Sequence, residues 1–165
     1  MPLDKKLRKM KLFLLTHAKE LDRKSNTGTL AVELLGDKVK VVLWERTKPN
    51  EELLRVIKQG NIALVYPREE SELLTQASSY EAYIIIDSTW QEAQKIYNRS
   101  PYLHDLPSVK IQTDKPSSFL LRRNQKEHGL CTAEIVSELL KSNSQSELAE
   151  VLEEKLHDFM SVKQK

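Results

Sequence analysis

Short apolar runs rich in valine and isoleucine recur along the chain, with helical patterns between them. The runs cover residues 11–17, 39–44, 62–66, 82–86 and 109–112. Strands that alternate with helices need crossover connections, and these favour a mostly parallel sheet with helices on both faces. The fold class predicted from this pattern is therefore α/β.

Start and stop signals place helices over residues 51–59, 88–97, 133–141 and 147–160. Asn50 can cap the first of them and Gly60 can end it. Ser88 with Gln91 makes a capping box for the second helix, and Thr132 can cap the third. The last helix is amphipathic and follows a polar break in the chain.

Length and composition favour a single globular domain over residues 1–165, with a core at about residues 11–141 and a C-terminal helix at about 147–160. With 39% hydrophobic and 30% charged residues, the chain is not a low-complexity disordered segment. The apolar runs are too short to cross a bilayer, and no secretory signal pattern opens the chain, so the cytoplasm is the expected location. Cys131 is the only cysteine, which excludes an internal disulfide and a cysteine-based zinc cluster.

Charge is unevenly distributed although the net charge is only +2. Residues 1–24 carry 8 basic and 3 acidic groups, and residues 95–128 carry 7 and 3. Two basic blocks can form one phosphate-binding face, as nucleic-acid recognition requires. The alternative is an ordinary solvated surface.

In parallel sheets ligands bind at the carboxyl ends of the strands, which draws attention to Asp87. It follows three isoleucines and begins the tetrapeptide Asp87-Ser88-Thr89-Trp90. A carboxylate beside a large aromatic side chain suggests a nucleobase site. The structural alternatives are a turn or capping role for Asp87 and core packing for Trp90.

Further motifs occur along the chain in a fixed order, over about residues 12–140. In addition to Asp87-x-Thr89-Trp90, they are His17-Ala18-Lys19-Glu20 with Asn26-Thr27-Gly28, Leu64-Val65-Tyr66-Pro67, Arg99-Ser100-Pro101-x-Leu103 with Leu106-Pro107-x-Val109, Ser118-x-x-Leu121-Arg122, and Thr132-x-Glu134. Together these motifs resemble the DTW-domain family. Two departures are the absence of the N-terminal cysteine cluster of many bacterial members, and His17-Ala18 in place of the usual His-Pro.

The resemblance implies transfer of a 3-amino-3-carboxypropyl group from S-adenosylmethionine to N3 of a uridine in tRNA. No metal is expected, because the four histidines are scattered and no cluster of His, Cys and carboxylate residues has ligand spacing. The resemblance also implies a SPOUT-like fold, which can include a C-terminal knot. Uridine N3 must lose a proton before it attacks, and Asp87 is the candidate general base.

The resemblance also assigns binding residues. The residues expected to bind S-adenosylmethionine are Thr27, Tyr66, Pro67, Thr89, Trp90, Leu106, Pro107, Thr132 and Glu134. The two basic blocks, rather than the resemblance, supply the residues expected to contact RNA phosphates: Arg23, Lys24, Arg99, Arg122, Arg123 and Lys126, with His128 in the second block. Some have plainer explanations: Thr132 as an N-cap, Thr27 as a turn residue and Glu134 as a favourable charge on a helix dipole.

Three other functions fit parts of the sequence. A SPOUT-type RNA methyltransferase would use the same cosubstrate in another pose. A non-catalytic RNA-binding module would keep the fold, although retention of Asp87, Thr89 and Trp90 argues against it. An interaction protein would act through the acidic C-terminal helix.

Overall fold

The six strands form one sheet in the computed structural model, which describes residues 10–17, 27–67, 71–74, 80–88, 90–111 and 132–164. The strands are β1 (Lys11–Thr16), β2 (Val39–Leu43), β3 (Ile62–Val65), β4 (Glu72–Leu73), β5 (Ala82–Asp87) and β6 (Ser108–Lys110). Their order is β2-β1-β5-β3-β6-β4, and every pair is parallel. The predicted parallel α/β sheet is confirmed.

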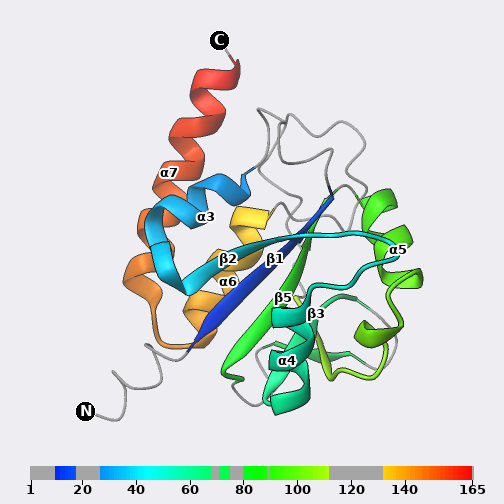
Figure 1. The fold of residues 1–165 in the computed structure, drawn as a ribbon. Helices are drawn as coiled ribbons and strands as arrows, with labels where there is room; N and C mark the ends of the chain where they lie inside the picture. The colour runs from blue at the N-terminus through cyan, green and yellow to red at the C-terminus, as the bar shows by residue number, and fades with distance from the viewer. Residues whose placement is uncertain are drawn as a thin grey trace.

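Helices cover both faces of this sheet (Figure 1). The α-helices are α3 (Gly28–Leu35), α4 (Glu51–Gln59), α5 (Trp90–Asn98), α6 (Thr132–Ser142) and α7 (Ser146–Gln164), and two short 3₁₀ helices are η1 (Gly36–Lys38) and η2 (Pro101–Leu103). Helices α3, α6 and α7 pack on one another on one face, and α4 and α5 lie on the other. Because parallel strands run opposite to their crossover helices, α3 and α6 begin at the carboxyl edge of the sheet.

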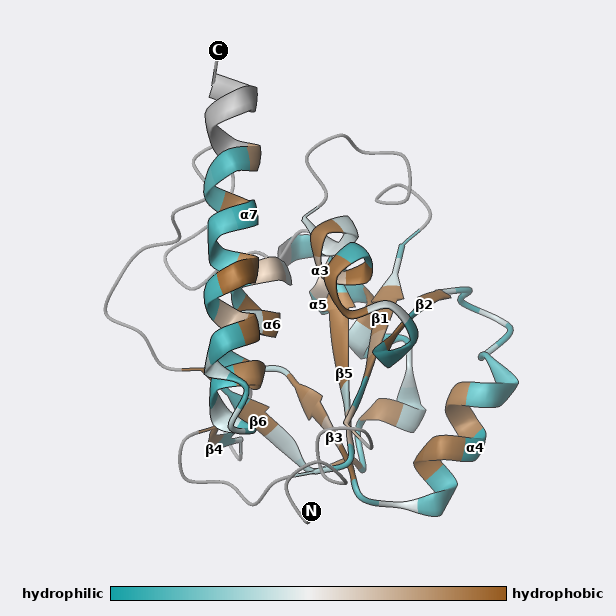
Figure 2. Ribbon diagram, turned by 90° about the vertical axis from the view of Figure 1, so that its left-hand side faces the viewer, coloured by the Kyte–Doolittle hydropathy of each residue, from teal (hydrophilic) through white to brown (hydrophobic). Residues whose placement is uncertain are grey.

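The middle of each central strand is apolar because helices bury both faces of the sheet (Figure 2). On β1, Leu12 and Leu14 belong to the core under α3, α6 and α7, whereas Phe13 and Leu15 belong to the core under α4 and α5. Successive side chains of a strand point to opposite faces, so one apolar run contributes to two cores. This explains why these segments read as continuous apolar runs.

Helix α4 begins and ends where its sequence signals predict. The side chain of Asn50 accepts a hydrogen bond from the backbone N–H of Leu53 at 2.9 Å. Gly60 follows the last turn with φ 87°, a conformation that side chains rarely adopt. An ion pair between Lys40 on β2 and Glu52 links this helix to the sheet.

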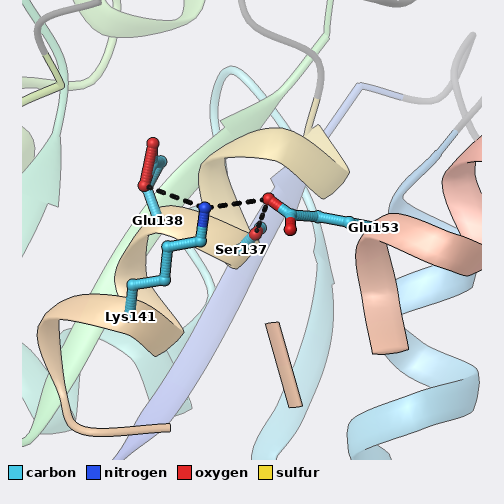
Figure 3. Close-up of polar contacts among 4 residues, drawn as sticks. All are labelled: Ser137, Glu138, Lys141 and Glu153. Carbon is cyan, nitrogen blue, oxygen red and sulfur yellow. Dashed lines mark hydrogen bonds and ion pairs between the residues drawn. The ribbon is translucent and has the colours of Figure 1, made fainter. Parts of the chain in front are cut away.

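Polar contacts join α6 to α7 (Figure 3). Ser137 and Lys141 of α6 both donate hydrogen bonds to Oε2 of Glu153, each at 2.9 Å, and Glu138 lies 4.0 Å from the Lys141 ammonium. The hydrogen bond to Glu153 raises the pKa of Lys141. Because apolar residues of α7 such as Leu152 and Leu156 are buried beside α6, this part of the C-terminal helix covers the core.

Most predicted elements are present within a residue or two at their ends, and α7 extends beyond the predicted 147–160. The helix over Gly28–Leu35 and the two-residue strand β4 were not predicted. Residues 112–131, which precede α6, lie outside the described part of the chain, so the knot and SPOUT likeness stay predictions. Of the helices described, none is both long and apolar enough to cross a membrane.

Candidate active site

Three adjacent strands end level with one another at the carboxyl edge of the sheet. Thr16, the last residue of β1, is in register with Leu43 of β2 and with Asp87 of β5. Side chains two residues apart on a strand point to the same face, so Thr16 lies on the face of Leu14 and Asp87 on the face of Ile85. This is the face covered by α3 and α6. Thr16 is 1% exposed and donates its hydroxyl to the backbone of Leu14 at 3.0 Å. This hydrogen bond holds the Thr16 side chain against its own strand, next to Asp87.

Asp87 is a buried carboxylate held by a hydroxyl from a distant part of the chain. Its side chain is part of a residue that is only 2% exposed. Oγ1 of Thr132, the first residue of α6, donates a hydrogen bond to Oδ1 of Asp87 at 2.6 Å. This length is typical of a hydroxyl that donates to an ionised carboxylate. The residues are 45 apart in sequence, so only the packing of α6 on the sheet brings them together.

Thr27 ties the start of α6 to the start of α3. Thr27 precedes α3 but makes no side-chain cap on that helix. Instead its Oγ1 accepts a hydrogen bond from the backbone N–H of Ala133 at 3.1 Å, across 106 residues of sequence. The hydroxyl of Thr132 donates to Asp87, and Thr27 accepts from the first turn of α6, so both residues make a contact between distant segments in addition to any local capping or turn role.

Two helix N-termini consequently meet near one carboxylate. The backbone N–H groups at the start of a helix carry partial positive charge and favour anions. Thr27, Asp87 and Thr132, all expected at the site, form one hydrogen-bonded group at this point. Glu134 lies in the first turn of α6 and is partly buried. Whether these residues bind a cosubstrate remains a prediction.

Tyr66 and Leu106 belong to the core on the opposite face of the sheet. Both are buried in the core under α4 and α5, at 8% and 7% exposure. The ring of Tyr66 stacks on Tyr97 of α5, with centroids 4.4 Å apart and planes at 13°, and burial raises the pKa of its phenol. Pro67 and Pro107, which follow them, are exposed. Because β3 and β6 are parallel, with Leu64 opposite Ser108, Tyr66 and Pro67 lie beyond the carboxyl end of β3, whereas Leu106 and Pro107 lie before the amino end of β6. The strand register therefore does not bring these two expected loops together.

Other expected residues are described only in part. Trp90 is the first residue of α5, and Thr89 before it lies outside the described residues. Of the expected RNA-binding set, Arg99 is described and exposed, directly after α5. The remaining residues expected to bind RNA lie outside the described part of the chain: Arg23, Lys24, Arg122, Arg123, Lys126 and His128.

Two residues outside the predicted binding set lie at the ends of the neighbouring strands: Trp44, which the sequence prediction missed, and His17, which it named in the first motif but did not assign to the site. Trp44 directly follows β2, and its indole N–H donates a hydrogen bond to Oγ of Ser100 at 2.9 Å. The ring of Trp44 also stacks on His17, the residue after β1, with centroids 6.0 Å apart. The available signal was position, since both residues immediately follow apolar strands. Within the described ranges, His, Cys, Asp and Glu side chains form no group of three or more that could hold a metal ion.

A parallel α/β sheet with a buried carboxylate and helix N-termini at its carboxyl edge is the architecture of a ligand-binding α/β domain. Residues 3–164 match the DTW domain, so this chain belongs to the DTW-domain family and the resemblance of its motifs is confirmed.

Curated relatives carry a more specific name. A protein of Drosophila melanogaster named tRNA-uridine aminocarboxypropyltransferase 2 is 29% identical over 155 residues, which cover 88% of this chain and 61% of the relative. A protein of Macaca fascicularis with the same name is 27% identical over 144 residues, covering 80% of this chain and 48% of the relative. The chain thus spans about half to three fifths of these relatives' length. No solved structure shows significant similarity.

Proposed function

We propose that this chain transfers the 3-amino-3-carboxypropyl group of S-adenosylmethionine to N3 of a uridine in tRNA. Membership of the DTW-domain family and the names of the two curated relatives support this reaction. The observation that carries it in this chain is the buried carboxylate of Asp87, held by Thr132 at the carboxyl edge of the sheet. Asp87 is also the first residue of the Asp-x-Thr-Trp motif.

In this reaction Asp87 acts as the general base. Uridine N3 is an imide nitrogen that becomes nucleophilic when it loses its proton, and a fixed carboxylate oxygen can accept that proton. S-adenosylmethionine supplies an electrophilic carbon bonded to a sulfonium, so that N3–C bond formation and C–S bond cleavage release neutral methylthioadenosine. Because the leaving sulfur becomes neutral, the chain needs no second acid to protonate it.

Placement of the two substrates is then the main task of the remaining residues. The N-termini of α3 and α6, with Thr27 and Thr132, suit the carboxylate of the transferred group. Glu134 in the first turn of α6 can pair with its ammonium. Correct alignment of nucleophile and electrophile contributes a large share of such rates.

The walls of the cosubstrate pocket are assigned to the loops after β3 and before β6. Tyr66 and Pro67 follow β3 at the carboxyl edge, next to the end of β5, whereas Leu106 and Pro107 precede β6 and are included by resemblance to the family alone. Trp90 at the start of α5 completes this set by resemblance to the family. On the RNA side, Arg99 is exposed near the same edge, as a phosphate contact requires.

Nucleoside mass spectrometry tests the proposal directly. Unmodified tRNA is incubated with the protein and S-adenosylmethionine, digested to nucleosides and compared with a reaction that contains Asp87→Asn. We expect aminocarboxypropyl-uridine together with methylthioadenosine, and much less of both with the variant. A methylated nucleoside with S-adenosylhomocysteine would instead identify a methyltransferase. RNA binding without any product would identify a non-catalytic binding module.

A further inference from the structure

Two aromatic rings stack at the carboxyl edge of the sheet, outside the residues assigned to the reaction. Trp44 follows β2 and His17 follows β1, and their ring centroids lie 6.0 Å apart with planes at 26°. The backbone N–H of Trp44 donates to the carbonyl of Thr16 at 2.8 Å, which continues the pairing of the two strands. The register of β1 and β2 therefore places Trp44 and His17 beside each other.

The Trp44 side chain is fixed at a second point. Its indole N–H donates to Oγ of Ser100 at 2.9 Å, and Ser100 is fully buried. Trp44 packs on the core under α4 and α5, yet both Trp44 and His17 remain partly exposed. An aromatic ring that hydrogen bonds already hold in place, and that is partly exposed, can stack on a planar ligand with little loss of conformational freedom.

The pair lies next to the proposed catalytic carboxylate. Thr16 is in register with Asp87, so His17 is one strand spacing across, about 4.8 Å, and one residue along, about 3.3 Å. The alternation of side chains places the rings on the opposite side of the sheet edge from Asp87. A nucleotide bound over the edge could therefore contact both.

Exposed cationic residues lie in the same chain segments as Trp44 and its partner Ser100. Arg46 and Lys48 are exposed in the loop that Trp44 begins, and Glu45 is the one acidic residue between residues 44 and 49. Arg99, also exposed, directly precedes the Ser100 that holds the indole. Aromatic stacking surfaces flanked by cations are the usual means of binding single-stranded RNA.

We propose that the Trp44–His17 pair stacks on a nucleobase of the RNA substrate, with Arg46, Lys48 and Arg99 contacting its phosphates. The inference rests on the proposed function in taking RNA as the substrate. The adenine of S-adenosylmethionine could stack on the same rings, but that cosubstrate carries a net positive charge. The exposed cations Arg46, Lys48 and Arg99 favour a polyanion instead.

Binding assays with two variants test this stacking. Trp44→Leu keeps apolar bulk for the core but removes the aromatic face, and His17→Ala removes the second ring. Stacking on an aromatic side chain changes RNA affinity by about fivefold to a hundredfold per base, so we expect Kd for tRNA and for oligouridylate to rise within that range for Trp44→Leu and less for His17→Ala. Calorimetric affinity for S-adenosylmethionine should change less than about twofold.

Tyr80→Leu is the matched control. Tyr80 is a partly exposed aromatic residue near the amino end of β5, so the same chemical change is made away from the carboxyl edge. Its RNA affinity should equal that of the unaltered protein. Thermal unfolding of each variant shows whether the fold is kept.

Unchanged RNA affinity in a folded Trp44→Leu variant overturns the proposal, as does a loss confined to S-adenosylmethionine. If Trp44→Leu does not fold, His17→Ala decides, and undiminished RNA affinity in that variant also overturns it. Because RNA binding is measured without turnover, its result does not depend on whether the protein catalyses the proposed reaction. Protein that binds RNA through these rings but forms no aminocarboxypropyl-uridine refutes the reaction only.

Discussion

Replacement of Thr132 by valine tests whether this residue positions Asp87, the proposed catalytic base. The two side chains have nearly the same shape, so Thr132→Val removes a hydroxyl and adds no bulk. Thr132 is 4% exposed and Asp87 is 2% exposed, with 2.6 Å between Oγ1 and Oδ1. The variant therefore leaves a buried carboxylate oxygen without the donor that Thr132 supplies.

The magnitude follows from the type of hydrogen bond that is removed. A hydrogen bond to a charged group contributes about 1.5–3 kcal/mol to the free energy of unfolding. For a chain of 165 residues, a loss of about 2 kcal/mol lowers Tm by about 4–8 °C. Displacement of the base should reduce kcat by about 10- to 100-fold, because proton transfer depends closely on geometry.

The pH dependence separates positioning from a purely structural role. A donor to a carboxylate favours its ionised form, so removal of that donor favours the protonated form. Since the general base must be ionised, the acidic limb of the kcat/KM profile should move to higher pH in Thr132→Val. Thr132→Ser, which keeps the hydroxyl, should restore the profile of the unaltered protein. The assay is formation of aminocarboxypropyl-uridine over a pH series.

Ser137→Ala is the matched control on the same helix. Ser137 is 2% exposed and also donates a hydroxyl to a carboxylate, Oε2 of Glu153, at 2.9 Å. Its removal should lower Tm slightly, because Glu153 is 47% exposed, and should leave the pH profile unchanged. A Thr132→Val variant with the same Tm and the same acidic limb as the unaltered protein would refute the positioning role.

Three further predictions concern the base, the RNA surface and a surface ion pair. Asp87→Asn should lower kcat by about 100- to 10,000-fold while Kd for tRNA and S-adenosylmethionine changes only a few-fold, as measured by single-turnover kinetics and calorimetry; near-normal turnover excludes the base. Replacement of the two arginines and the lysine within residues 122–126 by alanine should flatten the dependence of log K on log salt by about 0.7–0.9 for each phosphate that is no longer neutralised, and an unchanged slope places the RNA elsewhere. The hydrogen bond from Lys40 lowers the pKa of Glu52. The ion pair therefore stabilises the folded protein above pH 4.5, and this stabilisation is lost as the pH falls further and Glu52 is protonated. Glu52→Gln should therefore lower Tm by about 1–2 °C at pH 7, and the difference should disappear in acid; an equal difference at both pH values contradicts the assignment.

Local signals predicted the elements that carry them. Helix α4 has an asparagine cap, two glutamates in its first turn and a closing glycine, and its observed bounds match the prediction. Helix α3 was missed because it has no acidic residue in its first turn, no basic residue in its last turn and no side-chain cap. Strand β4 has only two residues, Glu72 and Leu73, which is too short for any periodic pattern.

The sequence predicted where the candidate site lies, but it did not predict the contacts of Asp87 that the structure shows. Asp87 was identified because it follows an apolar strand, and the carboxyl ends of parallel strands bind ligands. The hydroxyl that holds it comes from Thr132, and the α6 backbone is held by Thr27, across 45 and 106 residues of sequence. Sequence spacing carries no information about which distant hydroxyl meets which carboxylate.

The class of fold and the edge of the sheet at which chemistry is expected follow from local features: apolar runs, capping residues and the Asp-x-Thr-Trp motif. The strand order β2-β1-β5-β3-β6-β4, and the register that aligns Leu43, Thr16 and Asp87, became visible only in the folded chain. That register also brings Trp44 onto His17. Strand order depends on how helices α3 to α7 pack their apolar faces on the two sides of the sheet, and this packing is a property of the whole chain.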